Sequence, residues 1–138
     1  MAYLETFLSA VTGRLSDAGL DAVPEYESGL KPVPEDSFFV TAAVTDVRHE
    51  PPLPFDGGTA LPVTLTLRLR FHCRTGGDAE RLSVCWELTV LPALLRMGLA
   101  VSAAEFGGTV YDRTLDRLVR EGTVRIAGAV TLTPLQTA

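Results

Sequence analysis

The stretch LPVTLTLRLRFHCR, residues 61–74, decides the fold, because apolar and polar residues alternate along it without a break. A strict period of two is typical of a β-strand that buries one face. The buried face would carry the odd-numbered side chains, from Leu61 to Cys73. We expect the sheet to be covered on one side only. The other face would then meet solvent or another subunit, and it carries Arg68, Arg70, His72 and Arg74.

This strand is longer than a small domain needs, since it would span roughly 40 Å at about 3.3 Å per residue. A second alternating segment, residues 38–48, precedes it, and the two predict a hairpin that projects as an arm. Between them, residues 49–60 are rich in proline and glycine and are expected to lack regular structure. This flexible arm loop, bounded by residues 48–61, carries Leu53 and Phe55. It is either a disordered turn or a segment that orders on a partner and buries both side chains.

Two helices are predicted to cover the apolar face of the sheet. Residues 3–18 place an apolar stripe on one helical side, and Gly19 is positioned to end that helix. A turn and helix cap at residues 76–78 lead into a second helix, residues 79–95. Its apolar residues occupy more than one side, so we expect it to be largely buried. Pro92 predicts a kink or a break, after which residues 93–97 would continue as a second short segment that ends at Gly98.

The remaining segments complete the predicted fold. They are a short edge strand within residues 22–27, a connection at 101–108, a turn at 121–122, and a last strand at 123–133 in which Gly128 permits a bulge or the close approach of a neighbour. The charged segment at 109–120 fits a strand or a short helix, and irregular or strand structure is favoured before Asp116. We expect one α+β domain, residues 1–138. It would have an antiparallel or mixed sheet of about four strands, two helices on one face, and a long hairpin arm.

Composition limits the partners. Seventeen acidic residues against twelve basic ones give a net charge of -5, which argues against general binding to nucleic acid or to anionic membranes. No long apolar run or signal peptide is recognisable, because Glu5 interrupts the N-terminus. We therefore expect no membrane partner and no sequence-specific nucleic acid. The two cysteines, Cys73 and Cys85, are expected to be reduced core residues.

Candidate catalytic residues are sparse. The only histidines, His49 and His72, have no nucleophile or metal-ligand pattern around them, and we predict no catalytic, cofactor or metal site. Glu25 and Glu27 could form a carboxylate pair, but a solvated strand edge explains them better. Asp112 and Arg113 belong to a charged stretch that either neutralises itself or contacts another subunit.

The order of these elements resembles the tail terminator, or tail completion, proteins of long-tailed bacteriophages, of which the lambda-type minor tail protein U is the nearest pattern. The resemblance covers nearly the whole chain and is one of pattern and spacing rather than of strict motifs. A proline-rich segment before the first long strand departs from it. The stretches that carry the resemblance are residues 34–44, 61–73, 82–92, 111–113 and 123–133.

The resemblance implies a structural protein without catalytic activity. It would form a ring, usually hexameric, that caps the tail tube, stops its polymerisation and joins the tail to the head. Its partners would be other copies of itself, the tail tube protein and the head-tail connector protein. It would be a virion component assembled in the bacterial cytoplasm. The alternatives are a head-closure or neck protein, a small non-catalytic binding domain, and an enzyme that uses His72 or Glu25.

Overall fold

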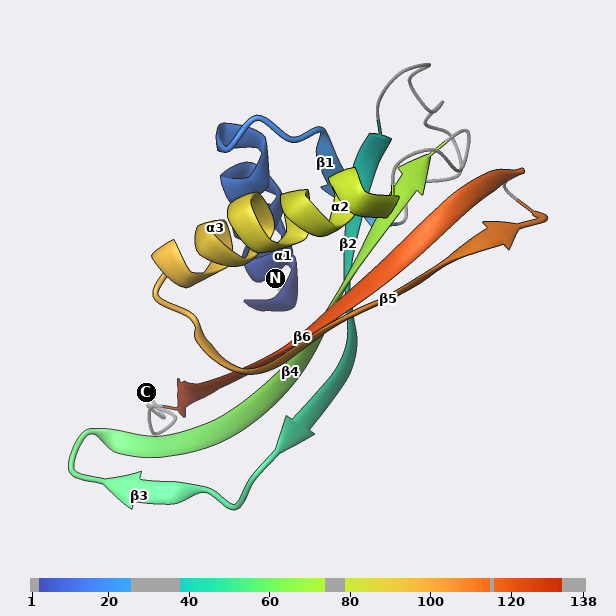
Figure 1. Ribbon diagram of the computed structural model, residues 1–138. Helices are drawn as coiled ribbons and strands as arrows, with labels where there is room; N and C mark the ends of the chain where they lie inside the picture. The colour runs from blue at the N-terminus through green and yellow to red at the C-terminus, as the bar shows by residue number, and fades with distance from the viewer. Residues whose placement is uncertain (1–2, 26–37, 74–78, 115, 133–138) are drawn as a thin grey trace.

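The computed structural model describes residues 3–25, 38–73, 79–114 and 116–132. Figure 1 shows one long, twisted sheet whose helices all lie on one face, while the strands extend past the helices at both ends. The α+β class is therefore confirmed. The elements are α1 (Tyr3–Asp17), β1 (Ala22–Pro24), β2 (Phe38–His49), β3 (Leu53–Phe55), β4 (Gly58–Cys73), α2 (Ala79–Cys85), the π-helix η2 (Trp86–Val90), α3 (Leu91–Arg96), β5 (Ala100–Asp112) and β6 (Arg117–Leu132).

The sheet has six strands rather than the expected four or so. Five of them follow the order β1-β2-β4-β6-β5, and β3 pairs with β4. β1 runs parallel to β2, and every other pair is antiparallel. Strands β3 and β5 are the two that the sequence pattern did not predict. Both strands lie at the edge of the sheet and are mostly exposed, so they lack the apolar alternation that marks a buried strand.

Strand β4 is the centre of the sheet, and its odd-numbered face forms the core as expected. Leu67, Leu69 and Phe71 are completely buried there. They pack with Val11 and Leu15 of α1 and with residues of the second helical segment in one hydrophobic cluster. The alternation of residues 61–74 therefore specifies which side of β4 the helices cover. Within the described segments, no helix is long and apolar enough to cross a membrane.

The first helix ends where the sequence predicts. Gly19 has a φ of 94°, a left-handed conformation that side chains with a Cβ rarely adopt. The amide of Leu20 donates to the carbonyl of Leu15, which closes the last turn. The predicted turn and cap at residues 76–78 lie outside the described residues, as does Glu27.

The second helical segment runs through Pro92 without a break, although the helix changes type next to the proline and continues as the short α3. A π-helical turn, in which the amide of Leu91 donates to the carbonyl of Trp86, precedes the proline. Pro92 then lies in the first turn of α3, where its missing N–H is tolerated. The segment is also less buried than predicted, because Val84, Leu88 and Leu95 project into solvent.

The structure overturns the predicted connection at residues 101–108 and the turn at residues 121–122. Residues 101–108 belong to β5, and residues 121–122 lie inside β6. This position of the strand requires a glycine, because a Cβ at Gly122 would lie 2.5 Å from the Trp86 ring. Gly128 forms no bulge either, since it pairs in regular register with Val63. Gly122 resembles a turn residue in the sequence, but in the structure it allows the helical segment to pack closely on the sheet.

The arm loop is also more ordered than predicted. Residues 53–55 form β3 against β4, and a two-residue turn at Asp56 and Gly57 connects them. Pro54 is compatible with this strand because β3 is an edge strand. The resulting hairpin continues β2 and β4 beyond the helices (Figure 1). We call the segment from Leu53 to Gly57 the arm tip.

Replacing Gly122 with alanine tests the close approach of the helix to β6. The added methyl group would collide with the Trp86 ring, which is itself stacked on Phe106 at 4.8 Å. We expect G122A to lower the free energy of unfolding by about 2 kcal/mol, measured by urea denaturation. The matched control is G128A in the same strand, where a Cβ meets nothing within 4 Å. Equal stability of the two variants would contradict this account.

Candidate functional site

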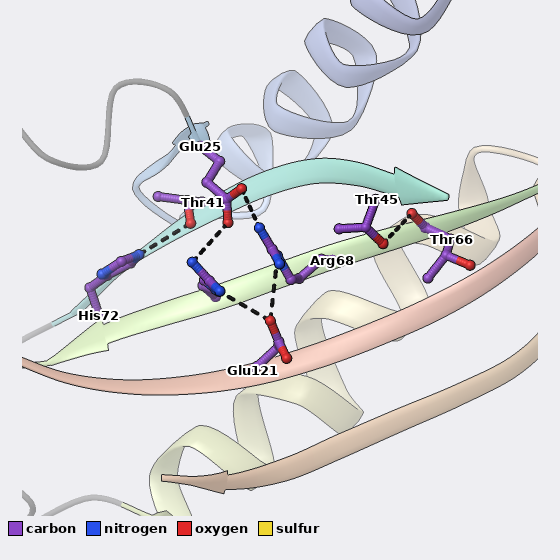
Figure 2. A network of polar contacts seen from close by, with 8 residues as sticks. Glu25, Thr41, Thr45, Thr66, Arg68, His72 and Glu121 are labelled. Atoms are coloured by element: carbon purple, nitrogen blue, oxygen red, sulfur yellow. Dashed lines mark hydrogen bonds and ion pairs between the residues drawn. The ribbon is translucent and has the colours of Figure 1, made fainter. Parts of the chain in front are cut away.

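The face of the sheet opposite the helices carries a network of four charged side chains (Figure 2). Arg68 Nη2 donates to Glu25 Oε2 at 2.5 Å, and Arg70 Nη1 lies 3.4 Å from Glu25 Oε1. On the other side, Glu121 Oε1 lies 3.4 Å from Arg68 Nε and 3.3 Å from Arg70 Nε. Two arginines and two glutamates thus neutralise one another across the sheet.

The register of the strands brings this network together. Arg70 of β4 pairs with Glu121 of β6, and Arg68 pairs with Ala43 of β2. Glu25 follows β1, on the far side of β2. Because Ala43 carries only a methyl group, the long side chains of Glu25 and Arg68 can meet above β2. The network therefore joins residues from three strand regions that are distant in sequence.

Arg68 and Arg70 were expected to be exposed to solvent or to meet another subunit, but they are paired with glutamates of their own chain. Their side chains are only 25% and 33% exposed, and both are paired. Paired arginines in this setting hold neighbouring strands together rather than offering free charge to a partner. Glu121 was missed because the sequence placed it in a turn. Arg74, the last residue of the predicted polar face, lies outside the described residues.

His72 was also expected to be exposed, and it is buried, with 1% of its surface accessible. Its ring stacks on Phe39 with centroids 4.6 Å apart, and its Nε2 lies 3.1 Å from the hydroxyl of Thr41. Burial, followed by the positive charges of Arg117 and Arg70, lowers the pKa of His72 to about 4. The ring is therefore neutral at physiological pH. Phe39, on the neighbouring strand and directly opposite His72, was the sequence signal for this burial.

A hollow of about 570 Å³ lies beside the charged network, near the β5–β6 end of the sheet. Val110 and Tyr111 in its wall are 67% and 53% exposed. Tyr111 donates a hydrogen bond to Asp116, which raises the pKa of the phenol. The structure thus brings the predicted contact residues Asp112 and Arg113 to one concave site. Its lining residues are Arg70, Gly107, Gly108, Val110, Tyr111, Asp112, Arg113, Val119 and Glu121.

The arm tip presents the other two predicted contact residues. Leu53 and Phe55 are 58% and 49% exposed. Their β4 partners are the even-numbered Ala60 and Gly58, so both side chains lie on the face of the sheet without helices. A Cβ at Gly57 would lie 2.9 Å from the Phe55 ring, so this glycine allows the ring to fold against the turn.

The described residues contain no group of three or more His, Cys, Asp or Glu side chains that could hold a metal ion. Cys73 and Cys85 are half-buried and form no disulfide. Burial raises the pKa of the Cys85 thiol, which disfavours the reactive thiolate. Glu25 is held between two arginines instead of beside a nucleophile. The chain matches no protein-family model, and no curated protein is significantly similar to it in sequence.

Replacing Glu25 with glutamine tests the contribution of the network to stability. The substitution leaves Arg68 and Arg70 with only Glu121 to balance them on a partly buried surface. We expect E25Q to lower the free energy of unfolding by about 1 to 2 kcal/mol, less at high salt. Glu105→Gln, an exposed change on β5, is the matched control and should have no measurable effect. A network without structural importance would give the same result for both variants.

The pH dependence of stability tests the burial of His72. The unfolded chain binds a proton with a pKa near 6.5, whereas the folded chain resists protonation until about pH 4. The free energy of unfolding that neutral His72 contributes is therefore fully present above pH 6.5, and it is lost as the pH falls toward 4. Between pH 7 and pH 5 this loss is about 2 kcal/mol.

The variant His72→Gln isolates this contribution from that of the carboxylates. It should be less stable than the wild type at pH 7, because the stacking on Phe39 is lost. Its stability should nevertheless fall less between pH 7 and pH 5, as measured by urea denaturation at both values. An equally steep fall in the two proteins would show that His72 does not cause the pH dependence.

Proposed function

We propose that the protein is a structural subunit of a phage or prophage tail, a tail terminator that assembles into a ring. The ring, expected to be hexameric, would cap the tail tube, stop its polymerisation and present a docking surface to the head-tail connector. The pattern of elements shared with tail terminators supports this proposal. The arm hairpin, which the long alternating strands predicted, is present in the fold, although it is more regular than expected.

The observation that carries the proposal is the presence of two unlike exposed surfaces at opposite ends of one sheet. One is the arm tip with Leu53 and Phe55, and the other is the hollow beside Val110 and Tyr111. A ring requires a heterologous interface, in which two different patches of each subunit are complementary. A chain that carries two such patches far apart on one sheet can bind a different neighbouring subunit through each of them.

The exposed edge strand β5 adds a third possible assembly surface. It pairs with β6 on one side and lies at the end of the strand order. Most of its thirteen residues are exposed. Two irregularities in its register with β6 interrupt the row of backbone groups at that edge. Such bulges disfavour uncontrolled strand addition, so a defined partner is favoured over indiscriminate aggregation.

A small non-catalytic binding domain is the second candidate, and the hollow is the observation that favours it. Its volume falls within the range of about 300 to 1,000 Å³ that is common for small-molecule sites. Its wall, however, combines glycines, exposed charges and two exposed apolar side chains instead of an enclosed apolar pocket. This arrangement suits a protein side chain that enters from outside better than a buried small ligand.

Light scattering on a sizing column, over a concentration series of the full chain, tests the proposed function. A tail terminator should give a closed oligomer with a mass near six times the 14.8 kDa chain mass. Negative-stain images of that species should show rings with a central opening. Addition of the rings to a polymerising tail tube protein should shorten the tubes. A closed dimer, or rings that leave tube length unchanged, would contradict the terminator proposal.

A further inference from the structure

The arm tip has the features of a group that inserts into another protein. Leu53 and Phe55 point to the same face of the sheet, and about half of each side chain is exposed. The turn residue Asp56 is exposed next to them. An exposed aromatic ring on a short, regular hairpin loses little conformational freedom when it binds, which favours its use as an anchor.

The hollow offers matching chemistry at the other end of the sheet. Val110 and Tyr111 supply apolar surface, and Arg113 supplies an exposed positive charge at the rim. Within the described part of the chain, neither Arg113 nor Asp56 makes an ion pair. The volume of about 570 Å³ is large enough for a phenylalanine and a leucine side chain together. The arm tip and the hollow therefore match in size and in exposed apolar side chains, and Asp56 and Arg113 carry opposite charges.

The arm tip cannot reach the hollow of its own chain. The tip joins the Gly58 end of β4, whereas the hollow is lined by Arg70 near the opposite end. Twelve residues of extended strand separate Gly58 from Arg70, a distance of about 40 Å. Figure 1 shows the hairpin at one end of the sheet, and the C-terminal end of β5 and the start of β6 at the other. An arm tip that enters the hollow would therefore have to come from a second copy of the chain.

We infer that the arm tip of one copy binds in the hollow of a second copy. Phe55 and Leu53 contact Val110 and Tyr111, and Asp56 pairs with Arg113. This contact deepens the proposed function and rests on it for its biological role, since it would link the subunits of the ring. The same contact could also join two copies reciprocally, each inserting its arm tip into the other. Stoichiometry therefore tests the proposed function, and the identity of the contact residues tests this inference.

Charge reversal followed by mixing tests the Asp56–Arg113 pair. The variants D56R and R113D each place like charges together, so each alone should self-associate at least about tenfold more weakly than the wild type. An equimolar mixture restores an opposite-charge pair at every contact between unlike copies. Light scattering should then show assembly of the mixture at concentrations where each variant alone stays dissociated. Failure of the mixture to assemble, or unchanged assembly by the single variants, would overturn the inference.

The apolar anchor is tested by Phe55→Ser, which should also weaken association at least about tenfold. Leu88→Ser is the matched control, because Leu88 is more exposed than Phe55 but lies on the helical side of the molecule. It should assemble like the wild type. Urea denaturation of both variants confirms that the fold is intact. Equal effects of the two substitutions, or a wild-type chain that stays monomeric at every concentration, would overturn the inference.

A photo-crosslinker locates the binding site directly. With p-benzoylphenylalanine in place of Phe55, irradiation of the assembled protein should link the arm tip to a second copy. Mass spectrometry should then place the linkage at residues 107–113 or 119–121. Crosslinks to any other region would overturn the inference, even if rings form and tubes are capped. Crosslinks at the expected site in a dimer would instead support the inference and contradict the terminator proposal.

Discussion

Burial of the odd-numbered face of β4 is the constraint on which the rest of the structure depends. Leu67, Leu69 and Phe71 are completely covered by the helices, and any slip of the strand by one residue would exchange them for arginines and a histidine. The free-energy cost of burying those polar side chains fixes the register of β4 against β2 and β6. The helices can therefore pack on one face only, and the described polar side chains Arg68, Arg70 and His72 are directed to the other.

The second face of the sheet is stabilised by a different kind of interaction. Opposite charges on β4, on β6 and beyond β1 balance one another, and His72 is covered by stacking on Phe39. These contacts lie toward the Cys73 end of β4, where Arg70 and Glu121 also form part of the wall of the hollow. Exposed apolar side chains occur at the two ends of the sheet, on the arm tip and in the wall of the hollow. The proposed contact between copies rests on these two surfaces.

The candidate site could be predicted only in part. Leu53 and Phe55 were recognisable because apolar residues in a proline-rich segment have no place in a core. The concave setting of Asp112 and Arg113 was not, because it depends on the pairing of β5 with β6. Glu121 resembled a turn residue beside Gly122, whose actual role is to make room for Trp86. Sequence patterns report the environment of each segment but not the identity of its neighbours across a sheet.

The sequence by itself determined the buried face of β4, the first helix and its glycine end, and the α+β class. These follow from periodicity and local backbone preferences, which act within a few residues. Tertiary structure alone decided the environment of the polar side chains of β4, the presence of the edge strands β3 and β5, and the hollow. Each of these depends on register between strands far apart in the chain. Arg68 and His72 occupy equivalent polar positions in the alternating stretch. In the structure, Arg68 is paired with glutamates, whereas His72 is buried against an aromatic ring.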